Sequence, residues 1–197
     1  MGSTLTELLA PMDVEVEVDH EPTWNVAPTD MHPVVEWGAE GPMVSTRSWG
    51  FTAHQDGRKA PINARWESVH ERPLFQKAIE RHRIAVPCTG WYEWQASPLG
   101  RHPHHLRPLG GGPCWMAGIR ADGRGGFAVL TKEAQASIRH IHTRMPVLLA
   151  NHEVLPWLSE HVPPAGPEVI EHWPVGMDVN RVGAVGPNLA SPLTTLF

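Results

Sequence analysis

The sequence predicts an α+β fold in which antiparallel β-strands predominate. Glycine and proline are frequent, with 18 and 20 among 197 residues. This density favours many short strands joined by turns and opposes a helical bundle. Short apolar or alternating runs recur along the chain, and few segments have a helical pattern. No repeat or long low-complexity linker divides the chain, so we expect a single compact domain over residues 1–197.

The first half of the chain contains the clearest helical pattern. Residues 71–83 place Pro73 near the first turn and Leu74, Phe75, Ala78 and Ile79 on one face, which indicates an amphipathic helix. A shorter helical pattern, residues 4–11, ends at a proline. Strand patterns occupy residues 13–20, 32–37 and 43–51.

The second half is expected to contain more strands than helices. Residues 96–113 are read as a loop because of their glycine and proline content. Short helices are expected at 134–142 and at 151–160, where Pro156 must interrupt the helix. The tail, residues 175–193, is rich in turn-forming residues. Further strand patterns lie at residues 83–94, 114–121, 126–134 and 144–149.

The composition excludes several classes of protein. With 16 Lys and Arg against 21 Asp and Glu, the net charge is −5, which opposes binding of long duplex DNA by charge alone but allows a local basic groove. Two cysteines form neither a disulfide framework nor a zinc-ligand spacing. No apolar run is long enough to cross a membrane and no signal peptide is recognisable, which favours a cytoplasmic protein.

An acidic residue stands among aromatic residues in the segment Thr-Gly-Trp-Tyr-Glu-Trp-Gln, residues 89–95. If Trp91, Tyr92 and Trp94 exclude water from Glu93, the pKa of its carboxyl should rise toward neutral pH. A carboxyl with such a pKa can both donate and accept a proton, as a general acid/base must. The alternative is an exposed glutamate on an edge strand.

Four polar clusters could carry chemistry: residues 24–28, 61–67, 91–94 and 141–146. Each has an ordinary structural interpretation when taken alone. His142 could be a hydrogen-bonded structural residue, and Asn25 and Asn63 could stabilise turns. Arg65 and Arg144 could form surface ion pairs that contribute little to stability.

Taken together and in this order, the clusters resemble the SOS response-associated peptidase (SRAP) family of abasic-site processing proteins, which form DNA–protein crosslinks. The resemblance extends from Trp24 to the C-terminus. It implies a compact β-rich fold with a β-barrel-like core, a few short helices and a groove for single-stranded DNA. The matching motifs are Asn-Val-Ala-Pro at 25–28, Trp-Gly at 49–50, Asn-Ala-Arg with Glu67 at 63–67, Gly-Trp-Tyr-Glu-Trp at 90–94, Met-Ala-Gly at 116–118, Leu-Thr at 130–131 and Ile-His-x-Arg-Met-Pro at 141–146.

The resemblance also implies a role for individual residues. In this family an N-terminal cysteine captures the ring-opened aldehyde of an abasic site through its α-amine and thiol, giving a thiazolidine. Asn63 would orient the captured sugar, Glu93 would act as general acid/base, and His142 would assist proton transfer. The residues implied to contact DNA are Arg65 and Arg144 at phosphates, Trp49 as a base-stacking wedge, and Asn25 and Thr131.

The partner implied by the resemblance is single-stranded DNA with an abasic site, and the context is the SOS response to DNA damage. Neither a cofactor nor a metal is implied. We expect a monomer that is cytoplasmic and associates with the nucleoid when it is bound to damaged DNA.

Position 2 departs from the family pattern, because Gly2 stands where a cysteine is expected and the opening Cys-Gly-Arg is missing. Three interpretations remain open. The natural start could lie upstream of Met1, or the chain could bind DNA without crosslinking. Alternatively, the Gly2 amine, freed by removal of methionine, could form a Schiff base that leads to strand cleavage by β-elimination.

Three other functions are considered from the residues alone. A thiol hydrolase or peptidase would use Cys88 or Cys114 as nucleophile and His142 as base. A metal site could form at His102, His104 and His105 in the segment His-Pro-His-His. A non-catalytic single-strand binder would use stacking on some of the nine tryptophans, which requires no sequence readout.

Overall fold

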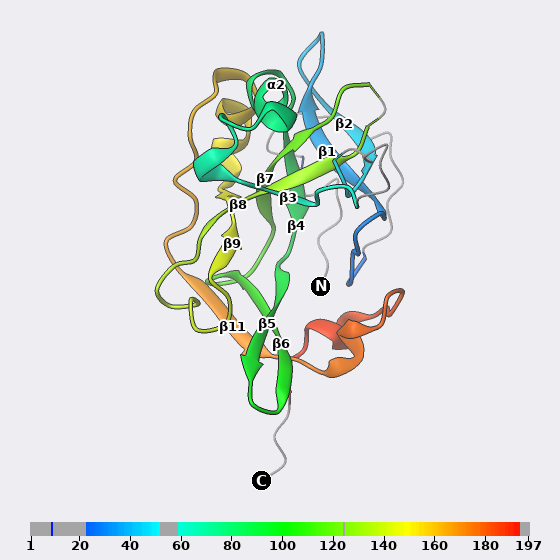
Figure 1. Ribbon diagram of the computed structural model, residues 1–197, viewed down its shortest axis with the longest axis vertical. Helices are drawn as coiled ribbons and strands as arrows, with labels where there is room; N and C mark the ends of the chain where they lie inside the picture. Colours follow the sequence, from blue (N-terminus) through cyan, green and yellow to red (C-terminus); the bar gives the residue numbers. More distant parts are fainter. Residues whose placement is uncertain (1–8, 10–22, 52–58, 124, 194–197) are drawn as a thin grey trace.

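The computed structural model describes Leu9 and residues 23–51, 59–123 and 125–193. Within these ranges the chain forms two β-sheets, one α-helix and several short 3₁₀- or π-helical turns (Figure 1). This confirms the expected α+β fold in which strands predominate. The helix expected at 4–11 lies outside the described residues except for Leu9, which is helical and fully buried. The strand expected at 13–20 lies outside them.

The larger sheet has the strand order β2-β1-β4-β7-β8-β3, with β10 paired to β7 and β9 paired to β8. Its pairings are antiparallel except for β3 with β8, which is parallel. No pairing among the described strands joins β3 back to β2, so the expected barrel-like core is an open sheet here. The strands are β1 (Met31–Trp37), β2 (Pro42–Ser48), β3 (Asn63–Arg65), β4 (Arg83–Cys88), β7 (Cys114–Arg120), β8 (Phe127–Glu133), β9 (Arg144–Pro146) and β10 (Leu148–Leu149).

The smaller sheet lies at the lower end of the view in Figure 1 and has the order β11-β6-β5. Its strands are β5 (Trp91–Ser97), β6 (Gly100–Pro108) and β11 (Ile170–Pro174). The loop expected at 96–113 is therefore wrong, because half of that segment is β6 and its first two residues belong to β5. Pro103 argued against a strand because proline lacks the N–H that a β-ladder uses. It is tolerated because it lies just beyond the last residue pair of β6 with β11, His104 with Pro174.

Helical segments are few and short in the described ranges. The helix expected at 71–83 is confirmed as α2 (Pro73–Arg81), which buries Phe75, Ala78 and Ile79 but leaves Leu74 exposed. Residues 134–142 form hydrogen-bonded turns in place of the expected helix. The other helical turns are η2 (Trp66–Ser68), η3 (Asn151–Glu153), the π-helical η4 (Pro156–Glu160), η5 (Met177–Asn180) and η6 (Pro187–Ala190).

Both faces of the larger sheet are buried, which explains why β4 and β7 are almost continuously apolar. One face packs with α2 and η4, where the Trp157 indole donates a hydrogen bond to the carbonyl of Ile84 (2.9 Å). The other face shares a core with the smaller sheet, through Trp91 and Leu106, and with the turns at 134–142, through Ile138 and Ile141. This second core fixes the smaller sheet relative to the larger one. No helix in the described ranges is long and apolar enough to cross a bilayer.

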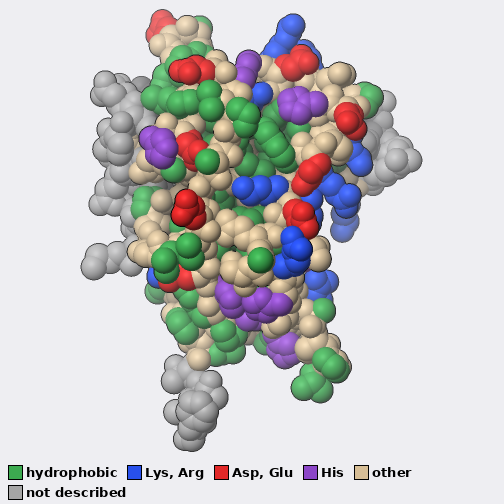
Figure 2. All heavy atoms as spheres, turned by 90° about the vertical axis from the view of Figure 1, so that its left-hand side faces the viewer, with side chains coloured by type: hydrophobic (Ala, Val, Ile, Leu, Met, Phe, Trp, Pro, Cys, Tyr) green, Lys and Arg blue, Asp and Glu red, His purple; other side chains and the backbone are tan. Residues whose placement is uncertain are grey.

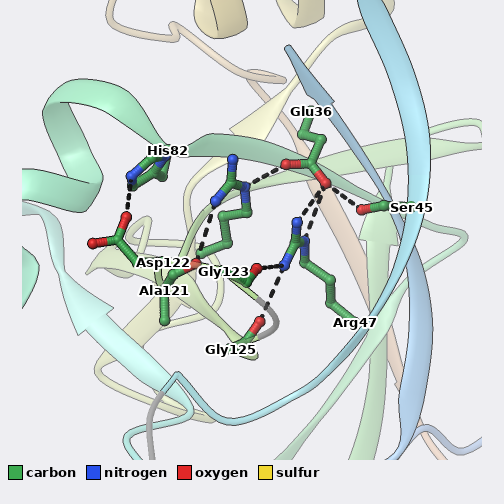
Figure 3. Close-up of polar contacts among 9 residues, drawn as sticks. Glu36, Ser45, Arg47, His82, Ala121, Asp122, Gly123 and Gly125 are labelled. Atoms are coloured by element: carbon green, nitrogen blue, oxygen red, sulfur yellow. Dashed lines mark hydrogen bonds and ion pairs between the residues drawn. The ribbon is translucent and has the colours of Figure 1, made fainter. Parts of the chain in front are cut away.

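A buried carboxylate ties strands of the larger sheet together. Glu36 on β1 accepts hydrogen bonds from Ser45, Arg47 and Arg120, and Arg47 also donates to the carbonyls of Gly123 and Gly125 (Figure 3). Burial alone would raise the pKa of Glu36, but these hydrogen bonds and the two guanidinium charges outweigh it and lower the pKa. Glu36 is therefore a structural carboxylate, and it does not line the main cavity.

Candidate functional site

A cavity of about 800 Å³ opens between the two sheets. Its walls come from residues 23–28, from β3, from the junction of β4 and β5, from β8 and β9, and from residues 179–182. Gly2 lies outside the described residues. The eight other residues singled out from the sequence all line this cavity: Asn25, Trp49, Asn63, Arg65, Glu93, Thr131, His142 and Arg144.

Glu93 and His142 form the acid–imidazole pair of the cavity. Glu93 Oε2 lies 3.4 Å from Nδ1 of His142. The same Nδ1 lies 2.9 Å from the carbonyl oxygen of Arg144 and 3.3 Å from the backbone nitrogen of Arg144, so the tautomer of His142 decides which of these two hydrogen bonds forms. The other ring nitrogen, Nε2, has no hydrogen-bond partner among the described residues.

The electrostatic environment of Glu93 matches the sequence-based expectation. Burial raises the pKa of Glu93 to about 7, although the charges of His142 and Arg101 act in the opposite direction. The side chain retains 21% exposure, so the carboxyl is reachable from the cavity. At neutral pH both protonation states of Glu93 are populated, which suits a group that must donate and accept protons.

The groups that remove water from Glu93 are not those the sequence suggested. Side chains alternate along a strand, so Tyr92 and Trp94 project to the other face of β5 from Glu93. There Tyr92 donates a hydrogen bond to the carbonyl of Trp24 (3.0 Å), and Trp94 donates to Asn180 (2.7 Å). Of the three rings, Trp91 alone shares the face of Glu93; Tyr92 and Trp94 line the same cavity from the other face of β5, so the three rings do not form a cage around the carboxyl.

Arg144 is held in place by a carboxylate that the sequence analysis gave no role. Its guanidinium forms two hydrogen bonds with Glu67 (2.9 and 2.8 Å) and one with the carbonyl of Thr131 (2.5 Å). The hydrogen bond from Arg144 is the main reason that the pKa of Glu67 falls to about 2. Glu67 thus stays ionised and fixes the direction of Arg144. The quoted motif already contained Glu67, but its pairing with Arg144 depends on the contact between η2 and β9.

Asn63 and Arg65 reach the cavity because β3 is a short strand at the edge of the sheet. Ala64 between them is buried, and alternation places Asn63 and Arg65 together on the exposed face. β3 runs parallel to β8, and Arg65 stands opposite Thr131. Among the described residues no carboxylate pairs with Arg65, so its guanidinium is available to an anion.

Trp49 and Asn25 line the cavity, and their side-chain nitrogen atoms donate hydrogen bonds to backbone carbonyls of neighbouring segments. The Trp49 indole donates to the carbonyl of Ile62 (2.9 Å), just before β3. The Asn25 amide donates to the carbonyls of Val179 and Arg181 (3.0 and 3.1 Å). Asn25 therefore fastens the segment at 23–28 to the C-terminal tail.

The thiols lack the arrangement of a catalytic nucleophile. Cys88 and Cys114 lie against each other, with their sulfur atoms 3.2 Å apart. The hydrogen bond between them and burial raise the pKa of Cys88 well above its usual value. The side-chain hydrogen bond of each thiol is to the other thiol and not to an imidazole of the described residues, so the structure does not support the thiol-hydrolase alternative.

The histidines of the His-Pro-His-His segment lie on β6 and project to both of its faces. Histidine side chains gather on the lower half of the face seen in Figure 2. Ring contacts join His104 to His172 and His172 to His140, whereas His105 packs between Tyr92 and Trp173 on the other face. In the described ranges, no three His, Cys, Asp or Glu side chains are arranged to hold a metal ion.

Comparisons with known proteins agree with this geometry. The family model of the SOS response associated peptidase (SRAP) matches residues 3–183, which is most of the chain. The chain belongs to the SRAP family. The abasic site processing protein YedK of Escherichia coli is 24% identical over 160 residues, covering 76% of this chain and 72% of YedK. YoaM of Bacillus subtilis, also called an abasic site processing protein, is 26% identical, covering 72% of this chain and 67% of YoaM.

Solved structures share the SRAP fold of this chain. A protein from Bacteroides thetaiotaomicron superposes with a TM-score of 0.72 at 21% identity, covering 84% of this chain and 82% of its own. A phage-related protein from Bordetella bronchiseptica superposes with a TM-score of 0.67 at 23% identity, covering 88% and 89%. At these identities the likeness establishes the fold alone.

Proposed function

We propose that this SRAP protein binds single-stranded DNA at an abasic site and captures the open-chain aldehyde of that site through its N-terminal amine. The observation that carries the proposal is the convergence of Asn63, Glu93 and His142, from three distant segments, on one cavity. The names of YedK and YoaM as abasic site processing proteins support the same substrate. The proposed partner is therefore DNA, with the chain acting as a monomer.

The proton transfers of imine formation fit the Glu93–His142 pair. An amine adds to an aldehyde to give a carbinolamine, which loses water to give an imine. Protonated Glu93 would donate the proton that allows the hydroxyl to leave, and its carboxylate would then accept a proton from the next intermediate. His142, whose Nε2 has no hydrogen-bond partner among the described residues, would serve as the second acceptor, and Asn63 would hold the sugar hydroxyls by hydrogen bonds.

In a chain whose N-terminal residue is Gly2, the amine would act without a neighbouring thiol. The imine is then the end of the capture step, because a thiazolidine requires a sulfur atom on the same residue as the amine. Removal of a proton from the carbon next to the imine would release the 3′ phosphate by β-elimination. Glu93 or His142 would take that proton, which makes the proposed activity that of a lyase with a reversible covalent intermediate.

The phosphates flanking the lesion would lie against Arg65 and Arg144. Arg65 projects from the exposed face of β3 without a carboxylate partner, and Arg144 is already oriented by Glu67. A preoriented guanidinium loses little conformational entropy when it binds phosphate. Trp49, beside Asn63 at the cavity, would stack on a base next to the abasic position.

A single-strand binder without chemistry is the second candidate, favoured by the tryptophans that line the cavity. The two functions differ in their preference for the lesion. We expect tighter binding to an oligonucleotide with one abasic site than to the intact oligonucleotide, together with an adduct on the abasic one. Equal affinity for both, without an adduct, would favour the binder.

A further inference from the structure

The two cysteines of the chain lie side by side at one wall of the cavity. Cys88 ends β4 and Cys114 begins β7, and the antiparallel register places them directly opposite each other. Their sulfur atoms are 3.2 Å apart, and both thiols are free. Directly opposed residues of paired antiparallel strands have Cα separations within the range that a disulfide can join. The strands therefore hold the pair ready for a bond.

Access to the pair is from one side. Cys88 is partly buried and lines the cavity, whereas Cys114 is only 5% exposed. A small oxidant entering the cavity would meet Cys88 first, with Cys114 behind it as the resolving thiol. The catalytic proposal uses neither thiol.

We propose that Cys88 and Cys114 form a reversible intramolecular disulfide when the cavity is exposed to a peroxide. The Cys88 sulfur attacks one oxygen of the peroxide and breaks the O–O bond, giving a sulfenic acid and releasing water from hydrogen peroxide. The Cys114 sulfur then attacks the Cys88 sulfur, and a second water leaves. Two thiols are thus oxidised by two electrons and one peroxide is reduced. A dithiol reductant reverses the bond by exchange.

The position of the bond gives it a consequence for the site. Cys88 and Cys114 are 26 positions apart, and the hairpin of β5 and β6, which carries Glu93, lies between them. Oxidation would close the segment that contains this hairpin into a covalent loop. The loop would lower the conformational entropy of the unfolded chain and so stabilise the folded protein. We expect the oxidised protein to unfold at a temperature higher by about 5–10 °C than the reduced protein.

The test is oxidation of the native, full-length chain with hydrogen peroxide at slightly alkaline pH, because the raised pKa of Cys88 slows the reaction at neutral pH. We expect both thiols to disappear together, a peptide map that joins Cys88 to Cys114, a chain that stays monomeric on a non-reducing gel, and reversal by dithiothreitol. The melting temperature should rise in the parent but not in Cys88→Ser or Cys114→Ser.

Four results would overturn the proposal, three of them in the chemistry of the thiols. Those three are thiols that persist in the folded protein and react only after unfolding, sulfinic or sulfonic acids in place of a bond, or disulfide-linked dimers. An equal rise in melting temperature in Cys114→Ser would also overturn it, because this variant cannot form the internal bond.

Discussion

Glu93 Oε2 and His142 Nδ1 lie 3.4 Å apart, although 49 positions separate the two residues in the chain. β5 carries the acid, and the turns that follow β8 carry the imidazole, so the pair exists only after the smaller sheet has packed on the larger one. The pair is therefore a product of tertiary packing. Its chemistry depends on burial that neither segment has alone.

Replacing Glu93 with glutamine should slow the proposed lyase reaction by about 100-fold or more, the usual contribution of a general acid/base. The amide keeps the shape of the side chain but cannot exchange a proton. The measurement is the single-turnover rate of cleavage of an abasic oligonucleotide. The matched control is Glu71→Gln, an exposed glutamate near the start of α2. An unchanged rate in Glu93→Gln would remove Glu93 from the mechanism.

Because the pKa of Glu93 is raised, the difference in free energy of unfolding between Glu93→Gln and the parent should depend on pH. The folded-state value of about 7 lies above the unfolded value of about 4.5, so the folded protein binds this proton more tightly. Ionising Glu93 therefore costs stability as pH rises from about 4.5 through about 7. We expect Glu93→Gln to be more stable than the parent by about 1–3 kcal/mol at pH 8 and equally stable at pH 4. Denaturant unfolding at pH 4 and pH 8 measures the free energy of unfolding of both proteins. A difference between them that is the same at both pH values would contradict the burial of the carboxyl.

Removing the Asn63 side chain should reduce adduct formation without destabilising the fold. Asn63 is exposed and its amide has no hydrogen-bond partner among the described residues. Asn63→Ala should therefore change the free energy of unfolding by less than about 0.5 kcal/mol. If Asn63 orients the captured sugar, adduct formation should fall by about 10-fold or more. A variant that forms adduct at the parental rate would show that Asn63 has no such role.

Arg65 should contribute to DNA binding through phosphate. Arg65→Ala is expected to weaken binding of single-stranded DNA and to lower the slope of log K against log salt by about 0.7. The control is Arg81→Ala, an exposed arginine at the C-terminal end of α2 that does not line the cavity. Titrations at several salt concentrations measure the slope. An unchanged slope for Arg65→Ala, or an equal change for Arg81→Ala, would show that Arg65 does not contact phosphate.

Introducing a thiol at position 2 should convert a reversible adduct into a stable one. In Gly2→Cys, once the methionine is removed, the amine and the thiol would share one residue and could close a thiazolidine with the aldehyde. We expect a band on a denaturing gel that survives heating without borohydride, absent from the parent. Gly2→Ser, which offers a hydroxyl in place of the thiol, is the matched control. A parent chain that already gives the heat-stable band would show that capture needs no thiol at position 2.

The strands that were predicted well are those with buried faces. β4, β7 and β8 are nearly continuous apolar runs because both faces of the larger sheet are covered, and α2 has a clear apolar stripe. β6 was missed because seven of its nine residues are histidine, arginine or proline, which do not give an apolar strand pattern. His104 and His105 are buried by ring packing with β5 and β11, which no local pattern reveals.

The sequence pointed to residues that share one cavity but not to the contacts that support them. Motif order pointed to eight of the residues that line the cavity, since residues needed for one reaction must converge wherever the chain places them. The pairing of Glu67 with Arg144 and of Cys88 with Cys114 depends on strand register across the larger sheet. The orientation of Tyr92 and Trp94 away from Glu93 could have been found from strand alternation alone.

The most direct test of the central claim is reduction with borohydride of a mixture of this chain and a single-stranded oligonucleotide that contains one abasic site. Borohydride reduces an imine to a stable amine, so the proposed intermediate becomes a covalent complex on a denaturing gel. We predict a complex with the abasic oligonucleotide, none with the intact one, and a much weaker band for Glu93→Gln. Absence of a trapped complex with the abasic oligonucleotide would contradict capture through the N-terminal amine.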